Sequence, residues 1–112
     1  MNIIELSMQQ TIETPHKVDI KRLFDTKDVQ VVHITLQPGE SLKRHITPVN
    51  VFFYVLEGKG MVEIGEETKV VGKDTLIESP ANILHCWYNQ GSEPLRFLVV
   101  KTPRPEKKSK IL

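Results

Sequence analysis

Two histidines are the residues of this sequence best suited to binding or catalysis. His45 lies in the stretch PGESLKRHITPVNVFFYVLEGKG, and His85 lies in ILHCWYN. A neutral imidazole can bind a divalent metal, exchange hydrogen bonds with a ligand, or transfer a proton near neutral pH. Acid–base catalysis without a metal would need a second positioned group, and no inward carboxylate or tyrosine accompanies either histidine. The sequence therefore favours binding over catalysis.

The elements that must position these histidines are strands. After residue 28 the chain consists of short apolar runs separated by turn residues, and no segment sustains helical spacing. Regular strand-sized runs with Gly- and Pro-rich punctuation predict an all-β fold, an antiparallel sandwich or barrel. Residues 16–24 (HKVDIKRLF) fit neither a strand nor a helix period cleanly, so both stay open there.

Two ordered motifs connect the barrel with a known family. The first motif contains Gly39, His45, Thr47, Val51 and Gly58, and the second contains Gly72, Pro80, Asn82, His85 and Asn89. Over roughly residues 29–102 this pattern resembles the cupin superfamily, which implies a double-stranded β-helix, or jelly-roll barrel. Asn82 stands where the family keeps glycine. We expect it in the left-handed conformation, which asparagine tolerates.

The resemblance implies a reduced metal site. Metal-binding cupins use two histidines and a glutamate from the first motif and one histidine from the second. His45 and His85 are therefore the metal candidates, while Thr47 and Val51 replace the other two ligands. Stable zinc sites use three or four protein ligands. Any divalent ion, whether Zn, Mn, Fe or Ni, should be held weakly.

Strand alternation predicts which side chains surround the histidines. Trp87 and Asn89 share the face of His85, and Phe53 shares the face of Val51. We expect a small-molecule pocket with apolar walls and a few polar points, a composition typical of ligand sites. Its ligand-binding residues would be Thr47, Phe53, Trp87 and Asn89. The alternative is a packed barrel, because small barrels are often filled by their own side chains. Pro48 can insert a bulge, which leaves the facing of Thr47 open.

Four other polar residues are weaker candidates. His33 alternates with a more apolar set of neighbours, so we expect it to face outward, with a role as third ligand as the alternative. Glu40 and Glu78 flank the motifs and are expected to be solvated loop carboxylates, although either could reach the mouth of the site. His16 lies outside the motif region and is interpreted as a surface residue.

Composition and length limit the partners. The 112 residues carry a net charge of +1, and the single cysteine, Cys86, excludes an internal disulfide. No apolar run approaches the ~20 residues that span a bilayer, and no motif suggests nucleic-acid binding, so we expect a cytoplasmic protein. Phe52, Tyr54 and Leu56 make the second face of a strand apolar as well. That face needs a cover, which either the N-terminal segment or a second copy of the chain would provide, and we expect a homodimer.

The predicted organisation is a single domain in three parts. Residues 1–28 form an extension that packs on the barrel or on a dimer partner, residues 29–102 form the barrel, and residues 103–112 form a frayed basic tail. The leading functional hypothesis is a module that binds a small molecule or a weakly held metal. The alternatives are a metal-dependent dioxygenase, decarboxylase or sugar isomerase, and a structural dimer module with a packed barrel.

Overall fold

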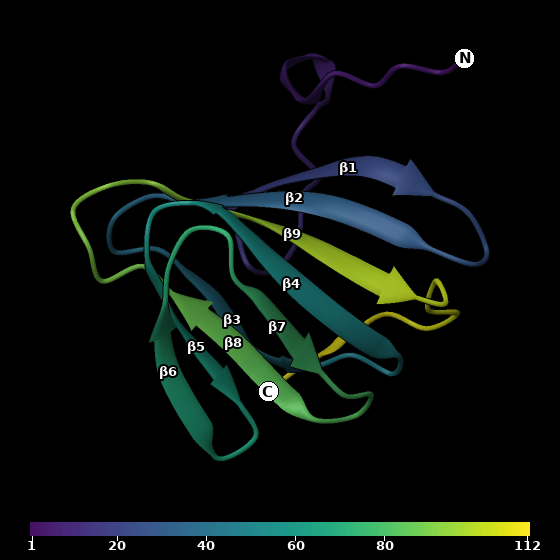
Figure 1. Ribbon diagram of the computed structural model, residues 1–112. Helices are drawn as coiled ribbons and strands as arrows, with labels where there is room; N and C mark the ends of the chain where they lie inside the picture. The colour runs from purple at the N-terminus through teal and green to yellow at the C-terminus, as the bar shows by residue number, and fades with distance from the viewer.

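Ten strands form two antiparallel sheets in this computed structural model, which describes all 112 residues (Figure 1). The first sheet has the order β1 (Asp19–Asp25), β2 (Gln30–Leu36), β9 (Leu95–Thr102), β4 (Asn50–Glu57), β7 (Leu76–Ser79). The second has the order β10 (Lys110–Ile111), β3 (Ser41–Ile46), β8 (Leu84–Tyr88), β5 (Gly60–Ile64), β6 (Glu67–Val71). The predicted all-β class is confirmed, and the ambiguous segment at residues 16–24 is mostly strand.

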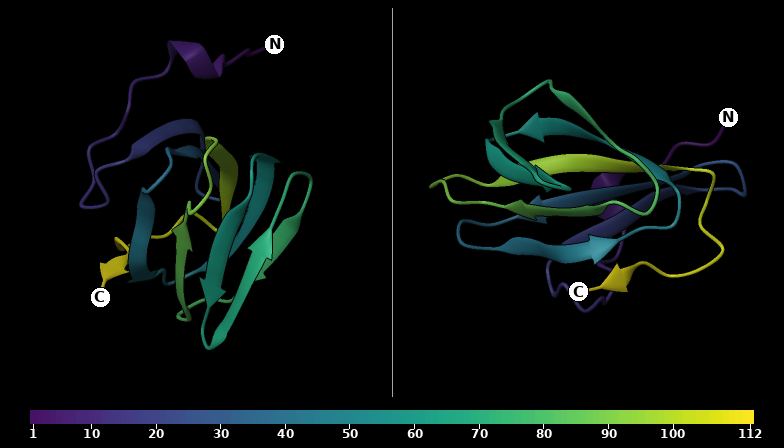
Figure 2. Two further views of the ribbon diagram at one scale, coloured as in Figure 1. Left: turned by 90° about the vertical axis from the view of Figure 1, so that its left-hand side faces the viewer. Right: turned by 90° about the horizontal axis from the view of Figure 1, so that it is seen from below.

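The only helical element is a short 3-10 turn, η1 (Leu6–Met8), near the N-terminus. No helix is long and apolar enough to cross a bilayer. The two sheets face each other and enclose the hydrophobic interior, as the turned views show (Figure 2).

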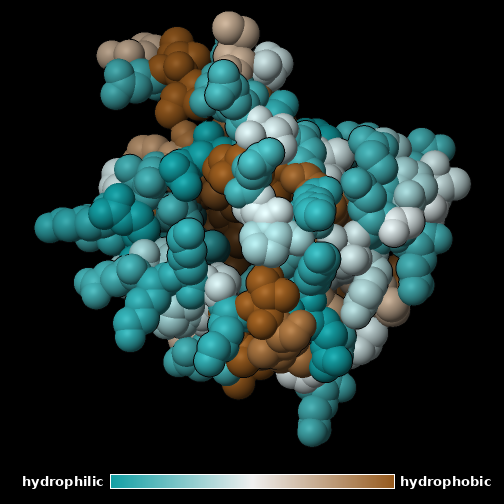
Figure 3. Space-filling view, turned by 180° about the vertical axis from the view of Figure 1, so that it is seen from behind, coloured by the Kyte–Doolittle hydropathy of each residue, from teal (hydrophilic) through white to brown (hydrophobic).

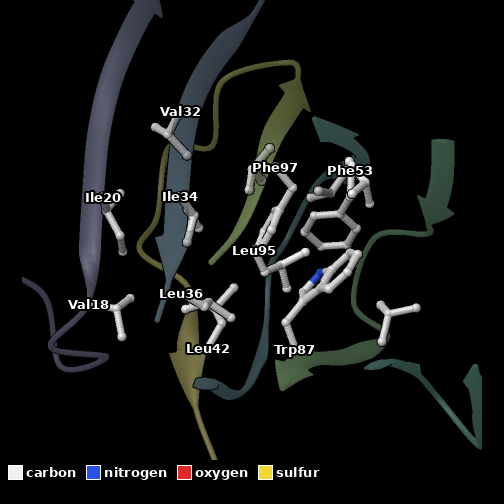
Figure 4. Packing of buried hydrophobic residues seen from close by; sticks show 14 residues of the cluster. Val18, Ile20, Val32, Ile34, Leu36, Leu42, Phe53, Trp87, Leu95 and Phe97 are labelled. Carbon is white, nitrogen blue, oxygen red and sulfur yellow. The ribbon is translucent and has the colours of Figure 1, made fainter. Parts of the chain in front are cut away.

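Aromatic rings fill the interior between the sheets. Trp87 and Phe97 stack with ring centroids 4.4 Å apart and planes 18° apart, and Phe53 meets Trp87 edge-on at 5.3 Å (Figure 4). All three side chains are fully buried. On β2 the expected alternation is confirmed, because Val32, Ile34 and Leu36 belong to the core. The centre of the barrel is therefore packed with side chains of the core.

The two ends of the chain differ from expectation. The first sheet begins at Asp19, whereas the motif-bearing barrel was expected from residue 29. The C-terminal tail does not fray. Lys110 and Ile111 pair with β3, and the amide of Leu112 donates to the Arg44 carbonyl at 3.0 Å. The edge of β3 has unpaired backbone N–H and C=O groups, and the tail binds them as an added strand. The lysine side chains of the tail do not prevent this pairing.

One asparagine and two glycines of the motifs have a left-handed backbone conformation. Asn82 has a φ of 64°, the left-handed conformation expected where the family keeps glycine. Gly58 has a φ of +83°, and a Cβ there would clash with the carbonyl oxygen of Pro94. Gly39 has a similar φ of +88°, but a Cβ there would meet nothing within 4 Å.

These two glycines provide a matched test of the fold. Gly39→Ala should cost about 1–2 kcal/mol of unfolding free energy, because only the backbone conformation is strained. Gly58→Ala should cost clearly more, because the same strain is joined by a backbone clash. Urea unfolding monitored by circular dichroism measures both. Equal losses in the two variants would contradict the close approach of Gly58 to Pro94.

Candidate functional site

The structure brings His45 and His85 together at one end of the barrel. The two residues are direct cross-strand partners on β3 and β8, and their Nε2 atoms lie 2.9 Å apart. The side chains are nearly inaccessible, with exposed fractions of 6% and 2%. Two histidines that are 40 residues apart in sequence, one from each motif, therefore form one buried imidazole pair.

The hydrogen bonds of this pair assign its protons. His45 Nδ1 lies 2.6 Å from the Lys43 carbonyl, which can only accept, so Nδ1 donates and Nε2 carries a lone pair. His85 Nε2 must then donate to His45 Nε2. His85 Nδ1 consequently accepts from the Ser79 hydroxyl at 2.7 Å. The result is a directed chain from Ser79 through both neutral imidazoles to the carbonyl.

Two further hydroxyls adjoin the pair. Thr47 is 1% exposed, and its Oγ1 lies 3.2 Å from His85 Nε2. The same oxygen lies 2.9 Å from the hydroxyl of Ser109, just before β10. The C-terminal segment therefore closes over the histidine pair. Sequence reasoning missed Ser79 and Ser109. Ser79 could have been found from its place directly before Pro80 of the second motif, whereas nothing marks Ser109.

His16 also belongs to the site, so its interpretation as a surface residue was wrong. Its Nδ1 accepts the backbone N–H of Lys43 at 2.9 Å, and its ring centroid lies 4.8 Å from that of His45. The side chain is half-buried. Lys43 thus binds both histidines through its backbone, one through the N–H and the other through the carbonyl.

The charges around the three histidines all have the same sign. Burial lowers the pKa of His85 to about 3, and the rings of His45 and His16, whenever they are protonated, act in the same direction as the fixed charge of Lys101. Burial likewise lowers the pKa of His16 to about 4, with His45, Lys43 and Lys101 contributing. The pKa of His45 is also lowered, mainly by burial and against the effect of its bond to Lys43. No carboxylate offsets these effects.

The other predicted pocket residues separate into two groups. Phe53 contacts His85 edge-on, with ring centroids 5.3 Å apart, and Trp87 packs behind it in the core. Asn89 lies four residues beyond His85, about 13 Å along an extended chain. Its amide group donates to the carbonyls of Leu36 and Glu93 and accepts from the amide of Gly91. Asn89 therefore closes a loop and does not reach the histidines.

The weaker candidates lie outside the cluster. His33 is on the outer face of β2, where Arg96 Nη1 donates to its Nε2 at 3.0 Å. The Glu40 carboxylate accepts a hydrogen bond from the backbone N–H of Gln37 within a turn. Glu78 is exposed and lies at the rim of a cavity of about 320 Å³. This cavity is also lined by Asn50, Val51, Phe52, Ser79, Pro80 and Thr102.

Known proteins place this barrel in a family. A family model described as the cupin domain matches residues 32–101, which is more than half of the chain. The chain belongs to the cupin superfamily. A solved structure from Thermus thermophilus is 28% identical and has a TM-score of 0.80, covering 94% of this cupin and all of that chain.

Two further relatives resemble this cupin. An uncharacterised protein of Methanocaldococcus jannaschii is 28% identical over 89 residues, which are 79% of this chain and 77% of that protein. The polyketide cyclase RemF from Streptomyces resistomycificus has a TM-score of 0.85 at 19% identity, covering all of this chain and 85% of its own. At that identity the likeness concerns the fold alone.

The residues of this cupin do not fit a firmly held metal ion. The two Nε2 atoms are close enough to share an ion, and both Nδ1 atoms have the outer hydrogen-bond partners typical of ligating histidines. However, no group of three or more His, Cys, Asp or Glu side chains could hold a metal. Thr47 adds only a hydroxyl, Val51 cannot coordinate, and the positive charge of Lys101 acts on both imidazoles.

Acid should destabilise this cupin because its histidines are buried in the neutral form. The pKa values of His85 and His16 are lower in the folded chain than the usual 6.5, so the unfolded chain binds more protons at acidic pH. Their contribution is complete above pH 6.5 and is lost as the pH falls towards the folded values. We expect a loss of at most about 1.4 kcal/mol per pH unit for each histidine.

Urea unfolding of EDTA-treated protein between pH 7.5 and pH 4.5 measures this dependence. His85→Gln should have a shallower dependence than the parent, because one proton fewer is taken up on unfolding. A free energy of unfolding that stays constant across this range would contradict the burial of neutral histidines.

Proposed function

We propose that this cupin binds a small organic molecule at the mouth of its barrel, with His45 and His85 as the polar anchors. The observation that supports this proposal is the directed hydrogen-bond chain of two buried neutral imidazoles and the Ser79 hydroxyl. Buried polar groups arranged around an apolar wall are the usual composition of a ligand site.

The two imidazoles offer different chemistry to a ligand. His85 presents an N–H at Nε2, whereas His45 presents a lone pair, because its own proton is held by the Lys43 carbonyl. A ligand acceptor would take over the N–H of His85, and a ligand donor would approach His45. Phe53 supplies an apolar surface beside them, and the cavity next to Ser79 supplies a route of entry.

An enzymatic role has less support. Oxygen chemistry on non-haem iron uses two histidines and a carboxylate on one face, and the family position of that carboxylate is Val51 here. Metal-free acid–base catalysis needs a group that holds or releases a proton near the working pH. Imidazoles with a strongly lowered pKa are weak bases at pH 7, which makes catalysis by this pair inefficient.

Elemental analysis combined with ligand screening tests the proposal. Protein purified without a His-tag should contain far less than one equivalent of metal, before and after incubation with Zn, Mn, Fe or Ni. A fragment library screened by NMR should give binders whose affinity falls at least tenfold in His85→Gln. The matched control is His33→Gln, on the outer face, which should bind as the parent does. One equivalent of metal, lost in both His45→Ala and His85→Ala, would instead support a metalloenzyme.

A homodimer is supported by a separate observation. Leu98 lies between His33 and Tyr54 on the outer face of the first sheet, in a surface that also includes Phe52 and Leu56. The N-terminal segment leaves large apolar side chains of its own exposed. Met1, Ile3 and Met8 are exposed, and the N-terminal segment stands away from the body at upper left in the space-filling view (Figure 3). A second copy of the chain would bury such a surface.

Light scattering after size exclusion tests the dimer. The parent should elute as a dimer, and Leu98→Glu should be monomeric, because it places a charge in the centre of the proposed interface. Val70→Glu is the matched control, since Val70 is 69% exposed on β6 in the other sheet. A parent that remains monomeric at 100 times its assay concentration would contradict the proposal.

A further inference from the structure

Lys101 lies near the end of β9, and its charge acts on the histidine pair. It continues the face of β9 that carries Leu95, Phe97 and Val99, all of which belong to the core. In register it lies directly opposite Val51 on β4, and Val51 lies opposite Ser79 on β7. Lys101, Val51 and Ser79 thus form one row across the first sheet. The hydroxyl at the end of this row binds His85.

The ammonium group of Lys101 has no acidic partner in the chain. It takes part in none of the four ion pairs, which join Arg22 and Arg104 to Asp25, Arg44 to Glu63, and Arg96 to Glu57. Its charge acts on His16, His45 and His85, and the charge that acts on Lys101 itself is that of Arg22. Removing an ammonium from water without a counter-charge is costly. The mouth of the barrel therefore lacks one negative charge.

Building on the proposed function, we propose that the ligand is a small monocarboxylate whose carboxylate group pairs with Lys101. One carboxylate oxygen accepts from the Lys101 ammonium. The other accepts the His85 Nε2–H, which in the free protein is directed at His45. The hydroxyl of Thr47, beside the same nitrogen, is a second donor. The hydrocarbon part of the ligand packs against Val51, which lines the cavity.

Charge and space both limit the ligand. Both imidazoles are neutral, so one ammonium balances a single negative charge, and a phosphate dianion would leave one charge without a partner. Glu78 at the rim of the cavity repels a second carboxylate, which disfavours dicarboxylates. Phe53, Trp87 and Phe97 fill the interior, whereas a cavity of about 320 Å³ is lined by Val51 and Ser79, two members of the row that contains Lys101, so the ligand must be small.

The same arrangement explains how the barrel functions with a reduced metal site. A metal ion would contribute positive charge between the two imidazoles and attract an anionic ligand. Here the position of the missing carboxylate ligand is Val51, and a lysine lies directly opposite it on the neighbouring strand. The protein thus supplies a fixed positive charge of its own, which attracts a carboxylate without an ion.

NMR titration with propionate and its neutral isostere propionamide tests the proposal. Both compounds are added at constant ionic strength to ¹⁵N-labelled protein, and the amide signals of Ser79, His85 and Lys101 are followed. Propionate should shift these signals to saturation, and propionamide should bind at least tenfold more weakly. Succinate and inorganic phosphate should also bind more weakly than propionate.

Variants of the intact chain locate the charge. Lys101→Met should weaken propionate binding at least tenfold, Lys101→Arg should retain part of it, and Lys69→Met, an exposed lysine on β6, should bind as the parent does. The comparison of propionate with propionamide uses the parent protein, so it decides the question even if a variant fails to fold.

The outcomes separate this inference from the proposed function. Equal binding of propionate and propionamide, or undiminished binding to Lys101→Met, overturns the carboxylate inference. If that binding is still lost in His85→Gln, the small-molecule site stands with a neutral ligand. Binding of neither compound also overturns the carboxylate inference, and the fragment screen then decides the proposed function by itself. Tighter binding of phosphate would overturn the assignment to a monocarboxylate.

Discussion

The hydrogen bond from His45 to the carbonyl of Lys43 determines the polar chemistry of this protein. A backbone carbonyl has no proton to give, so this 2.6 Å contact fixes the proton of His45 on Nδ1. Every later bond in the chain then has one direction, from His85 to His45 and from Ser79 to His85. Because the Lys43 amide also binds His16, one residue of β3 orients two imidazoles. The site is therefore organised before any ligand arrives, which reduces the ordering cost of binding.

The packing of the barrel decides where that organisation can be used. Trp87, Phe97 and Phe53 occupy the centre, and Phe53 also packs edge-on against the ring of His85. A barrel with a wide interior could hold a large substrate. In this barrel the centre is filled, so a ligand could bind only at the end that carries the histidine pair. The C-terminal strand closes part of the mouth through the contact between Ser109 and Thr47. The packing that stabilises the core thus also limits the space for any ligand at this end of the barrel.

The sequence predicted the fold and the central pair because both depend on local periodicity and on motif spacing. Alternation correctly placed Val32, Ile34 and Leu36 inside, and the turn chemistry of Asn82 was predicted correctly. His16 escaped prediction because its contact with Lys43 spans 27 residues and depends on the path of an irregular segment. Asn89 follows the predicted face, but its side chain satisfies loop backbone groups instead. Hydrogen bonds between loops have no period in sequence.

The positions of Val51 and Lys101 show why a site of this kind is not a metal site with one missing residue. A carboxylate restored at position 51 would lie directly opposite Lys101 and would pair with its ammonium before it could bind an ion. Thr47 would still contribute only a hydroxyl, and the charge of the new carboxylate would be neutralised by Lys101 instead of by an ion. Recovery of metal binding therefore requires coordinated change on β4, on β9 and at position 47. The present set of residues is a self-consistent alternative, in which the protein provides the cation and the ligand provides the carboxylate.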